Sequence, residues 1–527
     1  MRSNWFKYVF IIVVIIIIVF AVFKIRIDEQ QNEYQNNETS NVQKEKVKEI
    51  KLGMTQLDTM NPILSNNKNV QDISKLIYDP LVTLTSDYKA EPCLATEWAK
   101  QGTSYIIKLR ENVKWSDGMT FTSEDVKFTI DRLKDTQTIY ASNVQNVIGI
   151  DIVDDYTVRI NLDKEIPFFE YNLTFPILSK QYYEAQDFVN TEKNISPVGT
   201  GKYKISEVTA SYITLEKNQY WWNKDVDLTL EKITINIYSS IGELYNSFKT
   251  GNIDLVSTSN ENVQDYIGTI GYSIKEMKGR EHTFIALNTQ NYFLSKQEVR
   301  KAISYSIDKQ NIVSSIFASK YYTSSFPLDF GSWLCQEENA SSGYNVEQAK
   351  QILVDNGWSY RNQYWQKVEN YKTQRIVLNL LVKASNARDV AVAQNIKSQL
   401  ENQGIRINII QASDDQYQNS LQTKNYDMII CSTYVSPSPN LDTYFGENNL
   451  ANYSNEEVNN IRNEVMNTND ENIIQEKYKR LIEIYKTDIP YISLYFNKYT
   501  VAYSSEIAGD ITPNWFYQFY GIEGWYK

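Results

Sequence analysis

Apolar residues are distributed along the chain in two different ways. Residues 8–23 form one unbroken apolar run, YVFIIVVIIIIVFAVF, and residues 30–46 after it are almost entirely polar. From Val47 onward, short segments that alternate between apolar and polar positions take turns with longer segments whose apolar residues recur every three or four positions. Alternation is typical of half-buried strands, and the longer spacing is typical of amphipathic helices. The pattern predicts a mixed α/β globular part that follows an apolar N-terminal segment.

The clearest signals stand at the ends of the predicted elements. Thr122 precedes Glu124, Asp125 and then an apolar-periodic segment, which is the arrangement expected at a helix start. Asn356 and Gly357 end another helical segment, as C-terminal caps do. The predicted strands cover residues 48–52, 105–109, 157–162 and 405–410, and the predicted helices cover residues 72–78, 123–133, 298–316, 346–353, 390–400 and 471–485.

The N-terminal apolar segment predicts a membrane anchor. With its flanks it covers residues 5–25, about the 20 residues that a helix needs to cross a bilayer. A cleaved signal peptide is the alternative, but the residues after Ala21 form a poor cleavage site. We therefore expect residues 1–29 to be an uncleaved transmembrane signal anchor and residues 30–46 to be a flexible polar tether. The globular part is then expected outside the cytoplasm, on a single-pass cell-membrane protein.

The composition of the chain disfavours several classes of function. The formal net charge is -11, and such an acidic surface repels phosphate backbones, so we expect no nucleic-acid binding. The cysteines, Cys93, Cys335 and Cys431, are far apart and odd in number, which fits neither a disulfide framework nor a metal site. Cys431 stands in an apolar run and is predicted to be a buried thiol. His282 is the single histidine, which disfavours histidine-based metal sites and most catalytic triads.

Three glycine-containing segments indicate scaffold rather than chemistry. Ser116-Asp117-Gly118 is typical of a turn between a strand and the helix that follows. Residues 197–201 combine a proline with two glycines and predict a chain crossing at which side chains would not fit. Residues 250–254 predict a helix end with a glycine cap, followed by a strand.

These segments, in this order, resemble a known family: the large solute-binding proteins, family 5, of ABC importers for oligopeptides, dipeptides and nickel. The resemblance extends over nearly everything after Val47, and residues 94–133 carry its most specific stretch. The matching motifs are Lys114-Trp115-Ser116-Asp117-Gly118, Thr122-Ser123-Glu124-Asp125-Val126, Pro197-Val198-Gly199-Thr200-Gly201-Lys202-Tyr203, Thr250-Gly251-Asn252-Ile253-Asp254 and residues 299–309.

The resemblance implies a type II periplasmic-binding-protein-like fold in its large three-domain form. Two hinged lobes would close over a ligand, and a smaller domain would be inserted into the first. The expected division is lobe I at residues 47–68, 180–280 and 496–527, the inserted domain at 69–179, and lobe II at 281–495.

The same resemblance implies a function. The protein is expected to capture a small polar ligand, preferably an oligopeptide, and to deliver it to the permease subunits of an ABC importer. We expect a monomer that uses no cofactor or metal and catalyses no reaction. A membrane-anchored receptor that senses a peptide signal without transport, and a binder of a metal-chelate complex, remain alternatives. An anchored hydrolase is disfavoured because the sequence holds no HExxH, GxSxG or cysteine cluster.

Ligand contacts are also implied by the resemblance. In peptide-binding relatives the segment after the first strand lines the pocket, and its match here is Asn66-Asn67-Lys68. Tyr140 matches a pocket tyrosine of the small domain. For both segments an ordinary solvated loop is the alternative. His282 is a further candidate, as a contact to an anionic ligand, although a packed or surface histidine is the favoured interpretation.

The loop after residue 431 carries aromatics and an acid in relatives, and that acid pairs with the peptide's ammonium group. Here Thr433 and Tyr434 are candidates for ligand contact, but the position of the acid is Ser436 by ungapped alignment. A buried ammonium without a carboxylate partner is costly. Asp414 or Asp442 would therefore have to replace the acid, or the ligand would lack a free amine.

Overall fold

A computed structural model of the chain describes residues 48–527 apart from 185, 259–270, 329–330, 336–342 and 441. The predicted anchor and tether lie outside the described residues. None of the helices in the described part combines the length and the apolar character that a membrane crossing needs.

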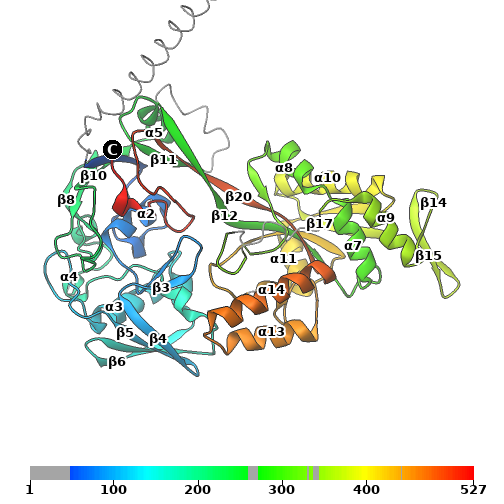
Figure 1. The fold of residues 1–527 in the computed structure, drawn as a ribbon, viewed down its shortest axis with the longest axis horizontal. Helices are drawn as coiled ribbons and strands as arrows, with labels where there is room; N and C mark the ends of the chain where they lie inside the picture. Colours follow the sequence, from blue (N-terminus) through cyan, green and yellow to red (C-terminus); the bar gives the residue numbers. More distant parts are fainter. Residues whose placement is uncertain (1–47, 185, 259–270, 329–330, 336–342, 441) are drawn as a thin grey trace, which may run out of the picture.

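Two bodies make up the described chain, and two long strands run from one to the other (Figure 1). These strands are β12 (Tyr272–Leu287) and β20 (Tyr491–Ser504), which pair antiparallel along most of their length. They stand in the middle of one sheet of order β18-β17-β19-β12-β20-β11-β1-β10-β9-β8. The register of the pair shifts between Lys278 and His282. The expected lobe boundaries at 280/281 and 495/496 both fall inside these two strands.

Lobe I builds its half of the sheet around β1, which runs parallel to β10 and β11. Helix α2 begins at Lys68 and not near Asp72 as predicted, because the Asn67 side chain caps it by accepting a hydrogen bond from the Asn69 backbone. The strands are β1 (Glu49–Thr55), β8 (Tyr203–Val208), β9 (Tyr212–Lys217), β10 (Lys232–Tyr238) and β11 (Leu255–Thr258), and the helices are α2 (Lys68–Ile77), α4 (Lys180–Tyr183) and α5 (Ile241–Lys249). Most of α2 falls in the range expected for the inserted domain, but the helix contacts β8 and is described with lobe I.

The inserted domain packs directly onto lobe I. Its sheet has the order β4-β5-β7-β6, and α3 contacts β6 and β7. One continuous hydrophobic cluster includes both Ile50 of β1 and Ile107 of β5, so the two parts share a core. The bounds are β2 (Val82–Leu84), β3 (Ala90–Pro92), β4 (Ala95–Gln101), β5 (Ser104–Leu109), α3 (Ser123–Lys134), β6 (Val147–Asp154) and β7 (Thr157–Leu162).

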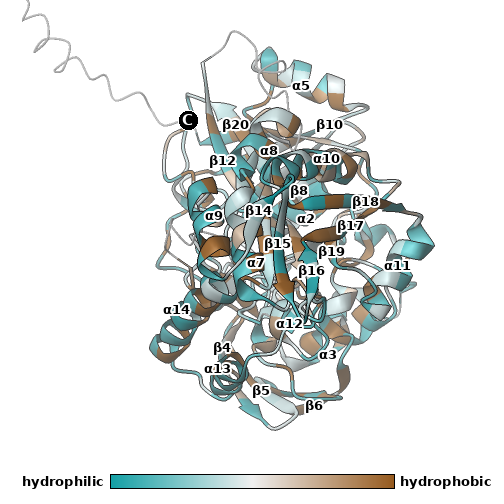
Figure 2. Cartoon of the chain, turned by 90° about the vertical axis from the view of Figure 1, so that its right-hand side faces the viewer, coloured by the Kyte–Doolittle hydropathy of each residue, from teal (hydrophilic) through white to brown (hydrophobic). Residues whose placement is uncertain are grey.

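Lobe II contains its own layered core. Alternate residues of β12 enter two clusters, Ile285 on one side and Phe284 on the other, because neighbouring strand residues point to opposite faces. In Figure 2, β17 and β19 are hydrophobic, and the mostly hydrophilic α11 lies outside them. The bounds are α7 (Gln297–Ser306), α8 (Lys309–Phe317), β13 (Tyr321–Thr323), α9 (Val346–Asp355), β14 (Ser359–Arg361), β15 (Tyr364–Glu369), β16 (Lys372–Arg375), β17 (Val377–Lys383), α10 (Ala387–Asn402), β18 (Arg406–Ala412), α11 (Asp414–Thr423), β19 (Met428–Tyr434), α12 (Asp442–Phe445), α13 (Glu456–Met466) and α14 (Glu471–Asp488).

Several local predictions are confirmed, and a second helix prediction, besides the start of α2, is wrong. Thr122 and Asp125 form a capping box at the start of α3. Cys431 is buried, and burial raises the pKa of its thiol to about 12. The segment 298–316 was predicted as one helix, but it forms α7 and α8. Ile307 is extended between them, and the Asp308 side chain caps α8 by accepting from the Asn311 backbone.

The predicted chain crossing at residues 197–201 is confirmed. Gly199 and Gly201 pass against the C-terminal end of α2, where the Gly201 backbone donates to the Ile77 carbonyl at 2.8 Å. A Cβ atom at Gly199 would lie 1.9 Å from that carbonyl oxygen, which leaves no room for a side chain.

Lobe II also contacts the inserted domain. Trp333 donates its indole N–H to the Tyr171 hydroxyl at 3.2 Å and its backbone N–H to the Asp87 carbonyl at 2.9 Å. Lys89 and Glu471 form an ion pair at 2.7 Å across the same boundary.

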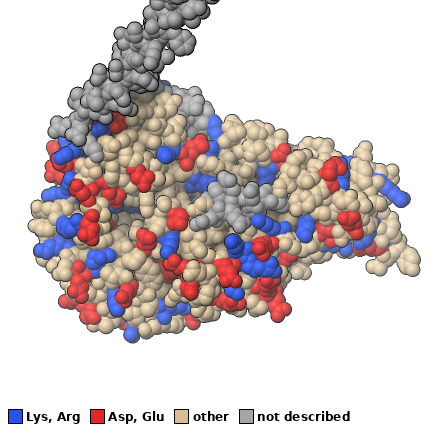
Figure 3. Space-filling model, viewed as in Figure 1, with Lys and Arg blue, Asp and Glu red and all other residues tan. Residues whose placement is uncertain are grey.

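Charged side chains of both signs are interspersed on the face of the molecule shown in Figure 3.

Candidate functional site

Three parallel strands of lobe II end at one edge of the sheet. β17 ends at Lys383, β18 at Ala412 and β19 at Tyr434, and helices α10 and α11 begin just beyond the first two. In open α/β sheets, ligands bind in the crevice outside the carboxyl ends of such strands. This edge is therefore a candidate ligand-binding region.

An aromatic cluster connects this edge with lobe I. The Tyr434 ring, whose residue is 62% exposed, lies 5.9 Å from the Trp515 ring, and Trp515 lies 5.4 Å from the Tyr499 ring. The Lys68 ammonium, at the start of α2, is 5.8 Å from the centre of the Trp515 ring. The aromatic cluster (Tyr434, Tyr499 and Trp515) thus brings together β19 of lobe II, the strand β20 and the C-terminal segment. Aromatic faces with a polar tip are well suited to bind an amphipathic ligand.

The segment after β1 lies beside this cluster. Asn67 caps α2 and donates its side-chain amide to the Gln56 carbonyl at 2.7 Å. Lys68 forms an ion pair with Asp72, whose side chain is almost completely buried. Of the three predicted residues in this segment, Lys68 approaches the aromatic cluster, whereas the side chain of Asn67 is used within lobe I.

Asn66 and Tyr140 are brought together by the inserted domain. The exposed Asn66 accepts a hydrogen bond at 2.9 Å from the Ile139 backbone, next to Tyr140. Tyr140 itself is buried, and its pKa is raised by burial and then by the Asp72 carboxylate. The two predicted contacts therefore share one wall with Asp72, although Tyr140 presents little surface to a ligand.

Arg280 determines the position of the loop that contains Ser436. Its guanidinium donates to the Val435 and Ser436 carbonyls, both at 2.9 Å. The same guanidinium lies 4.9 Å from the Tyr88 ring and 5.7 Å from the Phe516 ring. One buried arginine thus contacts the inserted domain, the C-terminal segment and lobe II at the edge where the lobes meet.

His282 belongs to the core of lobe II. It is fully buried, and its ring nitrogens lie 2.7 Å from the Tyr444 and Ser493 hydroxyls. Burial lowers the pKa of His282 to about 3, so the ring is neutral. The interpretation of His282 as a ligand contact is corrected here, because both ring nitrogens already have partners and the ring is shielded from solvent. Thr433, its cross-strand partner, is half-buried and remains a candidate.

The two acids expected to replace the one missing at Ser436 already have partners. Asp414, at the first position of α11, accepts from the Ser385 hydroxyl at 2.7 Å and pairs with Lys383 at 3.0 Å, and both contacts lower its pKa. Asp442 forms an ion pair with Arg462. A ligand ammonium at either acid would compete with an existing cation.

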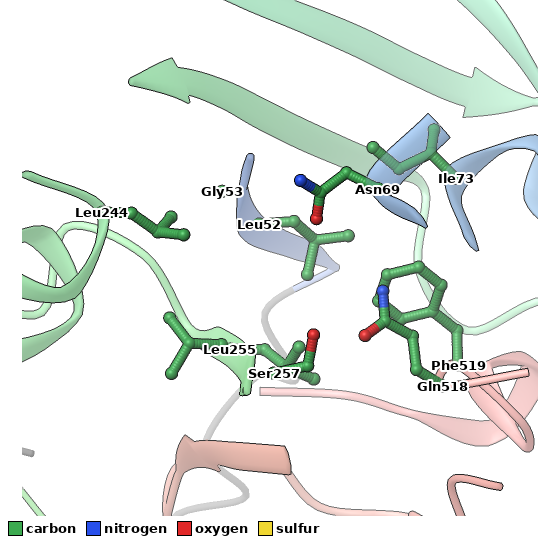
Figure 4. Close-up of a pocket in the computed structure, with 10 residues that line it drawn as sticks. Leu52, Gly53, Asn69, Ile73, Leu244, Leu255, Ser257, Gln518 and Phe519 are labelled. Carbon is green, nitrogen blue, oxygen red and sulfur yellow. The ribbon is translucent and has the colours of Figure 1, made fainter. Parts of the chain in front are cut away.

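A polar pocket opens in lobe I behind the aromatic cluster. Figure 4 shows the amides of Asn69 and Gln518 and the hydroxyl of Ser257 turned toward one space beside Leu52. Gln518 is 5% exposed, and its side-chain oxygen accepts no hydrogen bond from any described residue. Tyr499 donates to Ser257 at 3.3 Å, so the pocket adjoins the cluster. A buried acceptor without a donor is unfavourable by about 1–3 kcal/mol, so this pocket suits a donor group of water or of a ligand.

Trp515, Tyr499 and Gln518 were not found by sequence reasoning. A usable signal existed for two of them, because residues 515–526 are unusually rich in aromatic residues and belong to no predicted strand or helix. Within the residues that the structure describes, no group of three or more His, Cys, Asp or Glu side chains could hold a metal ion.

The family is established by comparison with known proteins. Residues 89–452 match the middle region of the bacterial extracellular solute-binding proteins, family 5. The chain belongs to this family. As a family 5 solute-binding protein it is similar to the heme-binding protein A of Haemophilus influenzae, with 22% identity over 85% of this chain and 87% of that protein. It is also similar to the oligopeptide-binding protein OppA of Bacillus subtilis, with 21% identity over 86% and 88%.

Solved structures show the same fold. HbpA2 of Haemophilus parasuis superposes with a TM-score of 0.74 and 20% identity over 90% of this chain and 99% of that one. The unliganded open form of the periplasmic murein tripeptide-binding protein MppA gives a TM-score of 0.73 and 18% identity over 91% and 97%. The family 5 solute-binding protein described here therefore has the type II periplasmic-binding-protein-like α/β fold that the sequence predicted.

Proposed function

We propose that this solute-binding protein captures short peptides between its lobes and delivers them to the permease of an ABC importer. The aromatic cluster is the observation that carries the proposal, because it joins elements of both lobes at the carboxyl edge of a parallel sheet. Peptides combine apolar side chains with backbone donors and acceptors, which suits aromatic rings beside Lys68 and Gln518. Relatives named as binders of oligopeptides and of murein peptide support this ligand class.

Binding without chemistry is part of the proposal. A ligand held by two bodies that are joined by β12 and β20 would favour the closed arrangement, because only that arrangement contacts it from both sides. The ligand would then be released unchanged.

We also propose that residues 5–25 anchor a monomer in the cell membrane, with residues 30–46 as a tether. The length and the apolar character of the run support this part. The permease would then find the binding protein held close to the membrane.

The proposal is tested with the full-length protein purified in detergent. Native mass spectrometry should detect short peptides bound to the protein, and the peptides released from it should have the same mass as before binding. Detection of a heme-like or metal-containing ligand instead would favour the metal-chelate alternative. Relatives named as a heme-binding protein and a nickel ABC transporter indicate which ligands this alternative would involve.

Trp515→Ala should lower the affinity for bound peptides at least about tenfold, because large aromatic residues at the centre of a site supply much of the binding energy. Isothermal titration calorimetry with a recovered peptide measures this. The control is Tyr371→Ala, which removes a completely exposed aromatic ring between β15 and β16 of lobe II. Equal affinities for the two variants would remove the aromatic cluster from the site.

A further inference from the structure

Glu281 lies directly opposite Tyr434 in the pairing of β12 with β19. Side chains at opposite positions of an antiparallel pair lie on the same face, about 5 Å apart. The pKa of Tyr434 is raised by partial burial and then by the Glu281 carboxylate, which agrees with this placement. Because Tyr434 lies 5.9 Å from Trp515, the exposed Glu281 stands at the edge of the aromatic cluster.

The carboxylate of Glu281 has no cation partner in the described part of the chain. Its backbone N–H donates to the Asn497 side chain at 3.1 Å, but its side chain forms no ion pair there. Glu276, on the same strand, behaves differently, since it pairs with Lys498 at 3.0 Å. Glu281 is therefore an acid beside the aromatic cluster, and its charge is available to a ligand.

A second carboxylate reinforces this negative region. Asp389, in the first turn of α10, is 8% exposed, and its pKa is raised to about 6 by burial and then by Glu281. Arg388 acts on Asp389 in the opposite sense and donates to the Tyr321 hydroxyl at 3.2 Å. A cation placed at Glu281 would relieve the repulsion between the two acids.

We infer that Glu281 receives an alkylammonium group of the ligand, with the rings of Tyr434 and Trp515 beside it. This inference rests on the proposed function and names the acid that serves in place of the one missing at Ser436. Asp414 and Asp442 are poorer candidates because Lys383 and Arg462 already occupy them. An ammonium group at this position would be stabilised by the carboxylate and by the aromatic faces together.

The test uses the full-length protein and three pools of tripeptides. The first pool has the form Xaa-Phe-Ala with free amino ends, the second is the same pool acetylated, and the third is an acetylated pool ending in lysine. Retention of each pool is measured by native mass spectrometry and the affinities by calorimetry. Wild-type protein should prefer an ammonium-bearing pool at least about tenfold, and Glu281→Gln should lose that preference. The first and third pools distinguish an α-ammonium from a side-chain ammonium.

The controls distinguish the proposed peptide binding from the assignment of the ammonium group to Glu281. Glu276→Gln removes a carboxylate from the same strand and should retain the wild-type preference, as should Asp414→Asn and Asp442→Asn. If Glu281→Gln keeps the preference, or if one of the other acids carries it, the assignment to Glu281 is overturned while peptide binding stands. If wild-type protein retains none of the pools, the proposed function and this inference are both overturned.

Discussion

Gly199→Ala is expected to destabilise the protein by more than about 4 kcal/mol, the range reserved for severe clashes and cavities. The added methyl group would lie 1.9 Å from the Ile77 carbonyl oxygen and 2.7 Å from its carbon. The end of α2 cannot easily retreat, because Ile77 is fully buried and its carbonyl accepts from Gly201. Since α2 also carries Lys68, any movement that relieved the clash would disturb one wall of the candidate site. Chemical unfolding followed by circular dichroism measures the change.

A matched glycine gives the control for this substitution. At Gly149, in β6, the nearest atom to an added Cβ would be the Asn161 side chain at 4.0 Å, which is ordinary contact. Gly149→Ala should therefore change stability by no more than about 0.5 kcal/mol. Unfolding midpoints that coincide for the two variants would show that the chain crossing at Gly199 is looser than described.

Features that depend on neighbouring residues were predictable from the sequence. The capping box of Thr122 with Asp125 needs only residues three apart, and a pair of glycines beside Pro197 signals close approach wherever the partner lies. The two helix errors, at the start of α2 and at the start of α8, also concern local signals. Asn67 and Asp308 are strong caps, and each decided where a helix began although apolar spacing alone suggested otherwise.

The composition of the site depends on distant pairings that no local pattern contains. Glu281 meets Tyr434 because of the register of β12 with β19, and a slip of one residue would turn each side chain to the other face. Trp515 reaches Tyr434 from the end of the chain because β20 crosses from lobe II back to lobe I. The family resemblance identified Asn66, Lys68 and the loop at Ser436 as candidates. At Ser436 the chain departs from the family pattern, and the resemblance does not indicate which residue replaces the missing acid.

The pH dependence of stability is expected to differ between the wild type and His282→Gln. The pKa of His282 is about 3 in the folded state because of burial, whereas an unfolded histidine titrates near 6.5. Between these values the unfolded chain binds a proton that the folded chain does not, so wild-type stability falls as the pH falls below about 6.5. The slope is about 1.4 kcal/mol per pH unit, or roughly 2 kcal/mol between pH 6.5 and 5. Glutamine does not titrate, and this part of the slope should disappear.

The comparison is made as a difference between two denaturation series from pH 5 to pH 7.5. Asp125 and Asp389 have folded pKa values raised to about 6 by burial, so they act in the opposite sense, but both proteins contain them and their effect cancels. A glutamine at this position can keep one of the two hydrogen bonds, to Tyr444 or Ser493, and should lower stability at pH 7.5 by about 1–3 kcal/mol. That constant loss does not change the slope. Parallel curves would mean that His282 is protonated or accessible in the folded protein, which would return it to the set of groups able to meet a ligand.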